Sequence, residues 1–261
     1  MYSDFHNDVL TVDRSALPAV SAKTACTVCA VYRGQRSTEE IFSVAEIFLR
    51  KRPDNLYLGF EDIGYACNEE MLEKVCSFRP VYASLTWNEE NELAGGCFSE
   101  KGLTEAGRRA VKKLTEAGIF LDCAHLNERS FYEAMEIGAK PVDSHTCFSA
   151  LWRHPRNLDD DRVREIVARG GLIGITFVEK FLCEGMALAE DVFSHVDHAV
   201  QKFGPDSFCF GSDFYGAERY AKGVENEQEL REIFLKHGYS SALTENIFTQ
   251  NLKSFLSKKV N

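Results

Sequence analysis

The feature that most constrains the fold is a regular alternation of short apolar segments with longer amphipathic ones. Several apolar segments lack polar alternation, which is typical of parallel strands covered on both faces. Eight segments have strand character: 3–8, 26–32, 56–61, 81–86, 119–124, 141–145, 172–177 and 207–213. With 261 residues, the chain has the length of a (β/α)8 barrel, for which about 250 residues are typical. We therefore predict an α/β fold, a TIM-type barrel of the metal-dependent hydrolase type, in a single domain covering residues 1–261. An open doubly wound sheet is the alternative, although no G-x-G-x-x-G follows the first strand.

Helical patterns lie between most of these strands. They cover residues 38–51, 104–117, 127–138, 159–169, 187–203, 225–236 and 243–258. The first helix is expected to start at a threonine cap with acidic residues in its first turn. Gly118 is expected to end the second helix as a C′ glycine. Asp159–Asp161 should cap the N-terminus of the fourth.

Composition excludes several kinds of partner. The net charge of −10 and a pI near 5.3 argue against nucleic acid and against an anionic membrane surface. No apolar segment approaches the ~20 residues needed to cross a bilayer, and the N-terminus lacks the pattern of a signal peptide. The nine cysteines are expected to be reduced, which favours a cytoplasmic location. Several lie in apolar strand-like segments and are expected to be core residues, including the Cys26-x-x-Cys29 pair.

Metal-capable residues recur at the ends of the predicted strands. In "DFHND", His6 and Asp8 fall on the same face of a strand, and this pair alone is better explained by a polar hydrogen bond than by a metal. Later strands end in further residues of the same kind: Glu61, His125, His145 and Asp213. Active sites of parallel barrels lie at this end of the strands, so the recurrence reverses the first interpretation.

Histidine and carboxylate ligands without thiolates suit zinc, manganese or iron in a catalytic site. These residues are enough for two cations about 3.5–4 Å apart, which could share a hydroxide and polarise a carbonyl. Glu61 could bridge the ions with its two oxygens. Asp213 would then act as general base and acid, with a pKa set by burial and by the nearby cations in opposite directions.

The segment "DSHTCFSALWRHPRNLDDDRVREIVARGGLIGITFVEKFL" resembles the signature region of the renal (membrane) dipeptidase family. The blocks "FHND", "GFE", "LTWNEENELAGG" and "FGSDFYG" are similar to further blocks of that family and follow in the same order. Its members are dinuclear zinc metallopeptidases of the amidohydrolase-like superfamily, and they hydrolyse dipeptides.

The resemblance implies a role for each candidate residue. His6 and Asp8 would bind one Zn²⁺, and His125 and His145 the second. Glu61 would bridge the two ions. Asp213 resembles the aspartate that protonates the leaving amine.

Arg156 in "HPRNL" resembles the arginine that binds the terminal carboxylate of the substrate, a task suited to a planar bidentate cation. The alternative for Arg156 is a surface ion pair with Asp159 or Asp160. His154, His195, His198 and His237 are expected to be structural or solvated.

Two departures from the family pattern bear on function. Better-known members have a histidine that contacts the developing oxyanion where this chain has Trp87. Tryptophan donates one N–H but carries no positive charge, and loss of an oxyanion donor typically lowers kcat by about 10²–10³-fold. Trp87 is therefore expected to line the substrate pocket, with a core position as the alternative. The segment between "HND" and "GFE" is also short, with one predicted strand and one predicted helix. The shorter loops after the first two strands could open the cleft or remove part of the expected homodimer contact.

The sequence thus predicts a zinc-dependent dipeptidase that cleaves the amide bond of small dipeptide-like substrates through a metal-bridging hydroxide. A related hydrolase acting on another amide is one alternative. The absence of a lysine at the end of the fourth or fifth strand disfavours the carbamylated-lysine members of the superfamily. A catalytically weakened metal-binding homologue, suggested by Trp87, is the other alternative.

Overall fold

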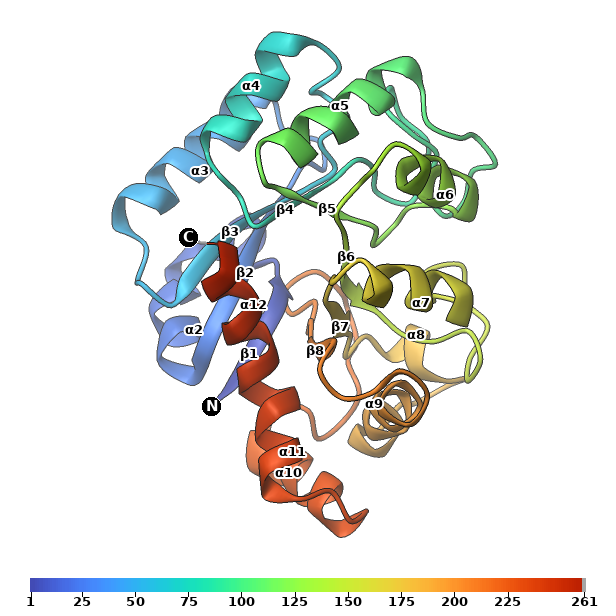
Figure 1. The fold of residues 1–261 in the computed structure, drawn as a ribbon. Helices are drawn as coiled ribbons and strands as arrows, with labels where there is room; N and C mark the ends of the chain where they lie inside the picture. The colour runs from blue at the N-terminus through green and yellow to red at the C-terminus, as the bar shows by residue number, and fades with distance from the viewer. Residues whose placement is uncertain (260–261) are drawn as a thin grey trace. The chain divides into compact units, whose positions relative to one another are not determined.

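A closed parallel barrel forms the centre of the fold (Figure 1). The computed structural model describes residues 1–259. The strands pair in chain order, and they are β1 (Tyr2–Asn7), β2 (Thr24–Tyr32), β3 (Leu56–Glu61), β4 (Tyr82–Ser84), β5 (Phe120–Asp122), β6 (Pro141–Thr146), β7 (Ile173–Ile175) and β8 (Phe208–Phe210). Each overlaps one of the segments expected to be a strand. The predicted (β/α)8 barrel is therefore confirmed.

Helices connect the strands, and one short segment is wound as a 3-10 helix and another as a π-helix. The α-helices are α1 (Val9–Val12), α2 (Leu17–Lys23), α3 (Thr38–Lys51), α4 (Glu69–Ser77), α5 (Glu105–Glu116), α6 (Glu128–Glu136), α7 (Asp160–Ala168), α8 (Glu179–Leu182), α9 (Ala189–Phe203), α10 (Glu227–Lys236), α11 (Ser241–Glu245) and α12 (Asn251–Lys259). The 3-10 segment η1 is Arg14–Ala16 and the π segment η2 is Asn246–Gln250. All seven predicted helices are present, but the last is divided into α11, η2 and α12.

Four helices were not predicted: α1, α2, α4 and α8. Three of them are short, so no helical period could emerge in them. The fourth, α4, buries only Leu72 and Val75. It begins after Asn68, whose side chain accepts a hydrogen bond from the backbone N–H of Met71 at 2.9 Å. That cap was the available signal, since asparagine is among the preferred residues at this position.

The ends of the predicted helices follow from capping. The expected threonine cap of α3 is wrong, because Ser37 is the cap and Thr38 is the first helical residue. Ser37 and Glu40 form a reciprocal capping box, with N–H to side-chain oxygen distances of 3.2 and 2.8 Å. Gly118 ends α5 with φ +70°, as predicted. Asp159 caps α7 by accepting from two backbone N–H groups, which also agrees with the prediction.

Two compact units are distinguished within the chain. Unit 1 comprises residues 1–27 and 143–261, and unit 2 comprises residues 28–142. In unit 2, α3 and α4 lie beside each other in blue to cyan (Figure 1), and Tyr82 is its largest fully buried side chain. In unit 1, Phe210 packs edge-on against Phe248 with centroids 4.7 Å apart, and Phe234 packs on Phe248 at 5.1 Å. These aromatic contacts attach α10 and η2 to the end of β8.

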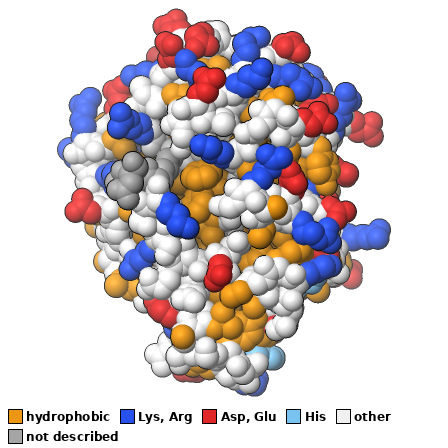
Figure 2. All heavy atoms as spheres, in the orientation of Figure 1, with side chains coloured by type: hydrophobic (Ala, Val, Ile, Leu, Met, Phe, Trp, Pro, Cys, Tyr) orange, Lys and Arg blue, Asp and Glu red, His pale blue; other side chains and the backbone are white. Residues whose placement is uncertain are grey.

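The surface carries acidic and basic side chains interspersed with hydrophobic ones, as Figure 2 shows for one face. Within residues 1–259 no helix has the length and apolarity that crossing a membrane requires. All nine cysteines are free thiols. Those predicted to be core residues are confirmed at five positions: Cys26, Cys29, Cys123, Cys147 and Cys209. Cys67 is exposed.

Candidate metal centre

His6 and Asp8 lie together at the end of β1 in unit 1, as the strand alternation predicted. The Nε2 of His6 is 3.2 Å from Oδ2 of Asp8, and the two side chains are 0% and 4% exposed. The other carboxylate oxygen of Asp8, Oδ1, is buried without a hydrogen-bond partner among the described residues. A buried carboxylate oxygen without a partner is costly unless a proton or a cation satisfies it.

His145 and Asp213 join this pair from β6 and from the segment after β8. One ligand atom from each of His6, His145 and Asp213 lies within 4.8 Å of the others. The rings of His6 and His145 have centroids 3.8 Å apart, and His6 Nε2 is 3.7 Å from Asp213 Oδ1. A Cβ at Gly216 would overlap both the Asp8 and the Asp213 carboxylates, so glycine is what allows the two acids to approach.

The Asp213 carboxyl is electrostatically perturbed. Burial raises its pKa to about 8, with His6 opposing the shift and the Asp8 carboxylate adding to it. The Asp213 side chain is 13% exposed, so a ligand can reach it. Its backbone has φ +61°, a left-handed conformation that is uncommon for residues other than glycine, asparagine and aspartate. An acid that holds its proton near neutral pH is suited to donating it to a leaving group.

Asp4 connects the ends of β1 and β8. Its carboxylate accepts from the Ser212 backbone N–H at 2.7 Å, from the Ser212 hydroxyl at 2.6 Å and from the Asn7 amide at 3.1 Å. Burial raises the pKa of Asp4, and these hydrogen bonds oppose the shift. Asp4 thus fixes the backbone that carries His6 relative to the backbone that carries Asp213.

Arg156 is buried rather than paired at the surface. It is 4% exposed, its Nη2 donates to the backbone oxygen of His145 at 3.2 Å, and its guanidinium lies 5.4 Å from the ring centroid of Phe181. The expected alternative partners bind other side chains: Asp159 pairs with Arg162 at 2.8 Å and Asp160 with His198 at 3.0 Å. The surface ion pair is therefore wrong, and a role toward the substrate stays a prediction.

In unit 2, Glu61 and His125 form a second pair of candidate ligands. The Nε2 of His125 is 2.7 Å from Oε1 of Glu61, and each side chain is 5% exposed. His125 Nδ1 lies 2.9 Å from the amide oxygen Oδ1 of Asn88, so Nδ1 carries the hydrogen. In the neutral ring, the Nε2 lone pair then faces the Glu61 oxygen, and a proton or a cation between them relieves that repulsion. His125 also has a positive φ of 80°.

Trp87 lies next to His125 in unit 2. It is 42% exposed, with its ring centroid 5.9 Å from that of His125 and 5.6 Å from that of Tyr32. A core position for Trp87 is therefore wrong. Its exposure is consistent with the predicted pocket wall.

Comparison with known proteins gives the family. The sequence model of the membrane dipeptidase family (peptidase family M19) matches residues 70–258, more than half of the chain. The chain belongs to the membrane dipeptidase family. The resemblance identified from the sequence is confirmed.

Two fungal relatives of this family carry dipeptidase names. Dipeptidase verJ of Clonostachys rogersoniana is 28% identical over 83% of this chain and 57% of its own length. Dipeptidase tcpJ of Claviceps purpurea is 28% identical over 66% of this chain and 43% of its own length. The chain thus spans about half the length of these curated relatives.

Solved structures share the fold. Dipeptidase AC, a metallopeptidase of the same family, has a TM-score of 0.86 at 22% identity and covers 99% of this chain and 98% of its own. A metallopeptidase from Rhodobacter sphaeroides, solved with a phosphinate mimic of the dipeptide L-Ala-D-Ala, has a TM-score of 0.83 at 21% identity, with 99% of both chains covered. These similarities extend over almost the whole barrel.

The residues of each unit fit the metal dependence of the membrane dipeptidase family. In unit 1, a buried carboxylate oxygen without a partner lies in the same side chain that contacts His6. In unit 2, a histidine lone pair faces a glutamate oxygen. Nitrogen and oxygen donors of this kind, already assembled and shielded from water, suit a divalent cation such as zinc.

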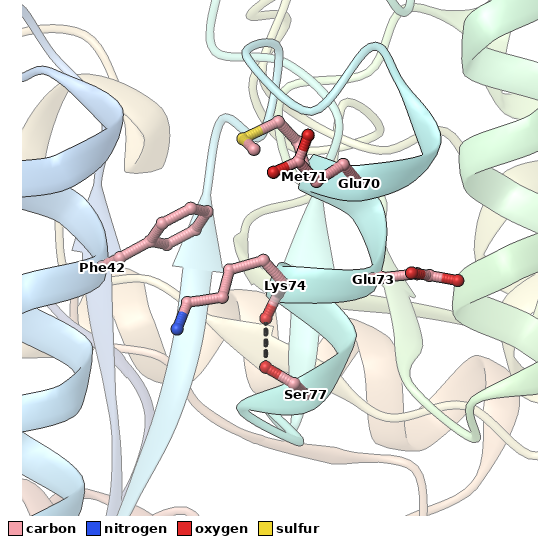
Figure 3. Close-up of a pocket in the computed structure, with 6 residues that line it drawn as sticks. All are labelled: Phe42, Glu70, Met71, Glu73, Lys74 and Ser77. Carbon is pink, nitrogen blue, oxygen red and sulfur yellow. Dashed lines mark hydrogen bonds between the residues drawn. The ribbon is translucent and has the colours of Figure 1, made fainter.

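A surface hollow of about 470 Å³ in unit 2 lies away from this chemistry (Figure 3). Phe42 of α3 faces Met71, Lys74 and Ser77 of α4 across it. The Lys74 ammonium is paired with Glu46 at 2.9 Å. None of the predicted site residues lines this hollow, so we assign it no role in the family's chemistry.

Three residues of the candidate site were missed by sequence reasoning: Asp4, Asn88 and Ser144. Asp4 lies two positions before His6, and Asn88 directly follows Trp87, so both belong to the motifs quoted from the sequence. Nothing in the sequence indicated where their side chains point. Ser144 contacts the Nδ1 atoms of His6 at 3.2 Å and His145 at 2.8 Å. Its contact with His6 joins positions 138 apart in the chain, and no local sequence pattern can predict a contact over that separation.

Proposed function

We propose that the chain is a metal-dependent dipeptidase that hydrolyses the amide bond of small dipeptides. The observation that carries the proposal is the group formed by the buried His6 and His145 with the partly exposed Asp213, in a member of the membrane dipeptidase family. This group combines imidazole ligands with an acid whose pKa burial raises to about 8. Cation binding and proton transfer are the two functions that amide hydrolysis needs from side chains.

The proposed cofactors are two zinc ions. His6 and Asp8 would bind one ion and His125 and His145 the other, with Glu61 as the bridging carboxylate. This assignment rests on the residue types at the strand ends and on the family membership, and the contacts within each unit are compatible with it. When bound, the ions would supply Lewis acidity toward the scissile carbonyl and toward a water molecule.

The remaining steps fall to the protein's own side chains. The bound cations would favour the ionised form of Asp213, opposing the effect of burial. Asp213 would then take the proton of the attacking water and deliver it to the departing amine nitrogen. Arg156 would bind the C-terminal carboxylate of the substrate, and the exposed ring of Trp87 would line the pocket. Because tryptophan can donate only one neutral N–H, oxyanion stabilisation would depend on the ions more than in members with histidine at this position. Homodimer formation and a cytoplasmic location stay predictions from the sequence.

Replacement of Asp213 by asparagine tests the proposal. The wild-type protein, loaded with zinc, should hydrolyse members of a panel of L,L and L,D dipeptides. Asp213→Asn should keep its zinc and lose at least about 10³-fold in kcat, since it removes the acid and base without changing shape. Asp206→Asn, at an exposed position of the same unit, is the matched control and should retain activity. Full activity of Asp213→Asn would refute the assigned role.

Elemental analysis tests the metal assignment independently. His145→Ala and His125→Ala should each lose one of two zinc ions per chain. Unchanged zinc content in either variant would remove that residue from the ligand set. Bound zinc in a wild-type protein that hydrolyses no amide in the panel would instead identify a binding protein.

A further inference from the structure

Strand β6 contains a bulge at the position of a predicted metal ligand. Asp143 is paired with Ile173 of β7, whereas Thr146 is paired with Ile175, so three residue steps of β6 lie opposite two of β7. In a regular strand, neighbouring side chains point to opposite faces. The extra residue changes that alternation, and the Ser144 hydroxyl lies 2.8 Å from Nδ1 of His145, its immediate neighbour.

Two glycines make room for this bulge within unit 1. A Cβ at Gly174 of β7, or at Gly211 just after β8, would overlap the backbone carbonyl oxygen of Ser144. Neither glycine has a positive φ, so the close approach of backbone, and not an unusual conformation, explains why glycine is needed. The register shift in β6 is therefore accommodated by glycines in β7 and just after β8.

The bulge brings one hydroxyl against two histidines. Ser144 Oγ is 3.2 Å from Nδ1 of His6 on β1, in addition to its contact with His145. The three residues are buried, with exposures of 0–1%, so water does not compete for these hydrogen bonds. A single side chain thus contacts the Nδ1 atoms of two residues that are expected to bind different ions.

The hydrogen-bonding capacity of a hydroxyl limits which histidine tautomers are compatible with this arrangement. A serine hydroxyl offers one donor and two acceptor positions. If it donates to one Nδ1, that ring carries its hydrogen on Nε2 and cannot bind a cation there. If it accepts from both Nδ1–H groups, both Nε2 lone pairs are available for metal.

We propose that Ser144 is a positioning residue that accepts from His6 and His145 together and so presents both Nε2 atoms to the metal ions. This inference rests on the proposed function, in which those histidines are ligands. It deepens that proposal, because one hydroxyl then prepares a ligand for each of the two ions. Loss of such partners typically lowers metal affinity about 10–100-fold.

Zinc titration of Ser144→Ala tests the inference. The variant should bind zinc about 10–100-fold more weakly than the wild type at both positions. Ser144→Thr keeps the hydroxyl and should restore most of the affinity. The control is Ser3→Ala, which removes another fully buried serine hydroxyl of unit 1, one that donates to the Thr249 backbone oxygen at 3.2 Å. Its zinc affinity should stay within about twofold of the wild type.

A second measurement needs no activity. Nitrogen-15 correlation spectra of the zinc-loaded wild type report which ring nitrogen of each imidazole carries the hydrogen, with signals assigned through single histidine variants. His6 and His145 should both carry hydrogen on Nδ1, and in Ser144→Ala these Nδ1–H hydrogens should exchange faster with solvent because their acceptor is gone.

Each outcome decides for or against Ser144. An Nε2–H tautomer at either ring of the wild type would overturn the inference, even if Ser144→Ala failed to fold. Wild-type zinc affinity in a folded Ser144→Ala would also overturn it. A protein that binds zinc in this Ser144-dependent way but cleaves no dipeptide would refute the proposed function and leave the role of Ser144 standing.

Discussion

Acidification should destabilise the fold through His195, a histidine on α9 that no proposed chemistry uses. It is 1% exposed, its Nδ1 accepts from the backbone N–H of Phe148 at 3.1 Å, and its Nε2 lies 3.0 Å from the backbone oxygen of Leu182. Only the neutral ring with hydrogen on Nε2 satisfies both contacts. Protonation would place a second N–H against the N–H of Phe148 and would break that bond.

The magnitude follows from the shifted pKa. Burial lowers the pKa of His195 to about 4, compared with about 6.5 in an unfolded chain. Between about pH 6.5 and pH 4, His195 is protonated in the unfolded chain but stays neutral in the folded protein. The free energy of unfolding therefore falls as the pH falls through this range. By linkage the loss is about 2 kcal/mol between pH 7 and pH 5, and about 3 kcal/mol by pH 4.

Urea unfolding of wild type and His195→Gln at a series of pH values measures this effect. Glutamine keeps a donor for Leu182 and does not titrate, so the stability difference between the two proteins should shrink by about 2 kcal/mol between pH 7 and pH 5. Release of any bound cation at low pH would occur in both proteins and would cancel in the difference. His198→Gln removes an imidazole from the same helix, in contact with Asp160, and serves as control. A pH-independent difference between wild type and His195→Gln would refute the reasoning.

Two further substitutions test packing and capping. Gly211→Ala places a methyl group against the Ser144 carbonyl oxygen. The resulting strain should lower the free energy of unfolding by about 2–3 kcal/mol and should also lower the zinc content. An unchanged urea denaturation curve would show that the backbone accommodates the methyl group without strain. Ser37→Ala opens the capping box of α3 and should cost about 1 kcal/mol in urea unfolding, with a loss below about 0.3 kcal/mol contradicting the cap.

The fold was predictable because its signals are local. Apolar segments bounded by polar residues identified every strand, and α3 has the predicted bounds of residues 38–51 because its apolar face and acidic first turn coincide. The predicted ligands were also visible, since each lies in or just beyond a strand. Within unit 1 the structure brings the predicted ligands His6 and His145 together with the carboxylate of Asp213, the predicted acid and base.

The partners of those ligands were not predictable in the same way. Asn88 hydrogen-bonds His125 across 37 positions, and Ser144 reaches His6 across 138. Strand alternation would in addition have placed Ser144 on the face opposite to His145. The bulge that reverses this depends on Gly174 of β7 and on Gly211 just after β8, so no single segment of the sequence reveals it.

The left-handed backbone at Asp213 has an evolutionary consequence. Few residues adopt φ +61° without strain, and asparagine and glycine are foremost among them. A lineage released from selection for catalysis would therefore drift at this position mainly toward asparagine, which is one nucleotide away from aspartate. Such a descendant would keep its fold and its proposed cation ligands. Because the backbone at Asp213 accepts asparagine, a single substitution could convert an enzyme of this family into a protein that binds the same small molecules without cleaving them.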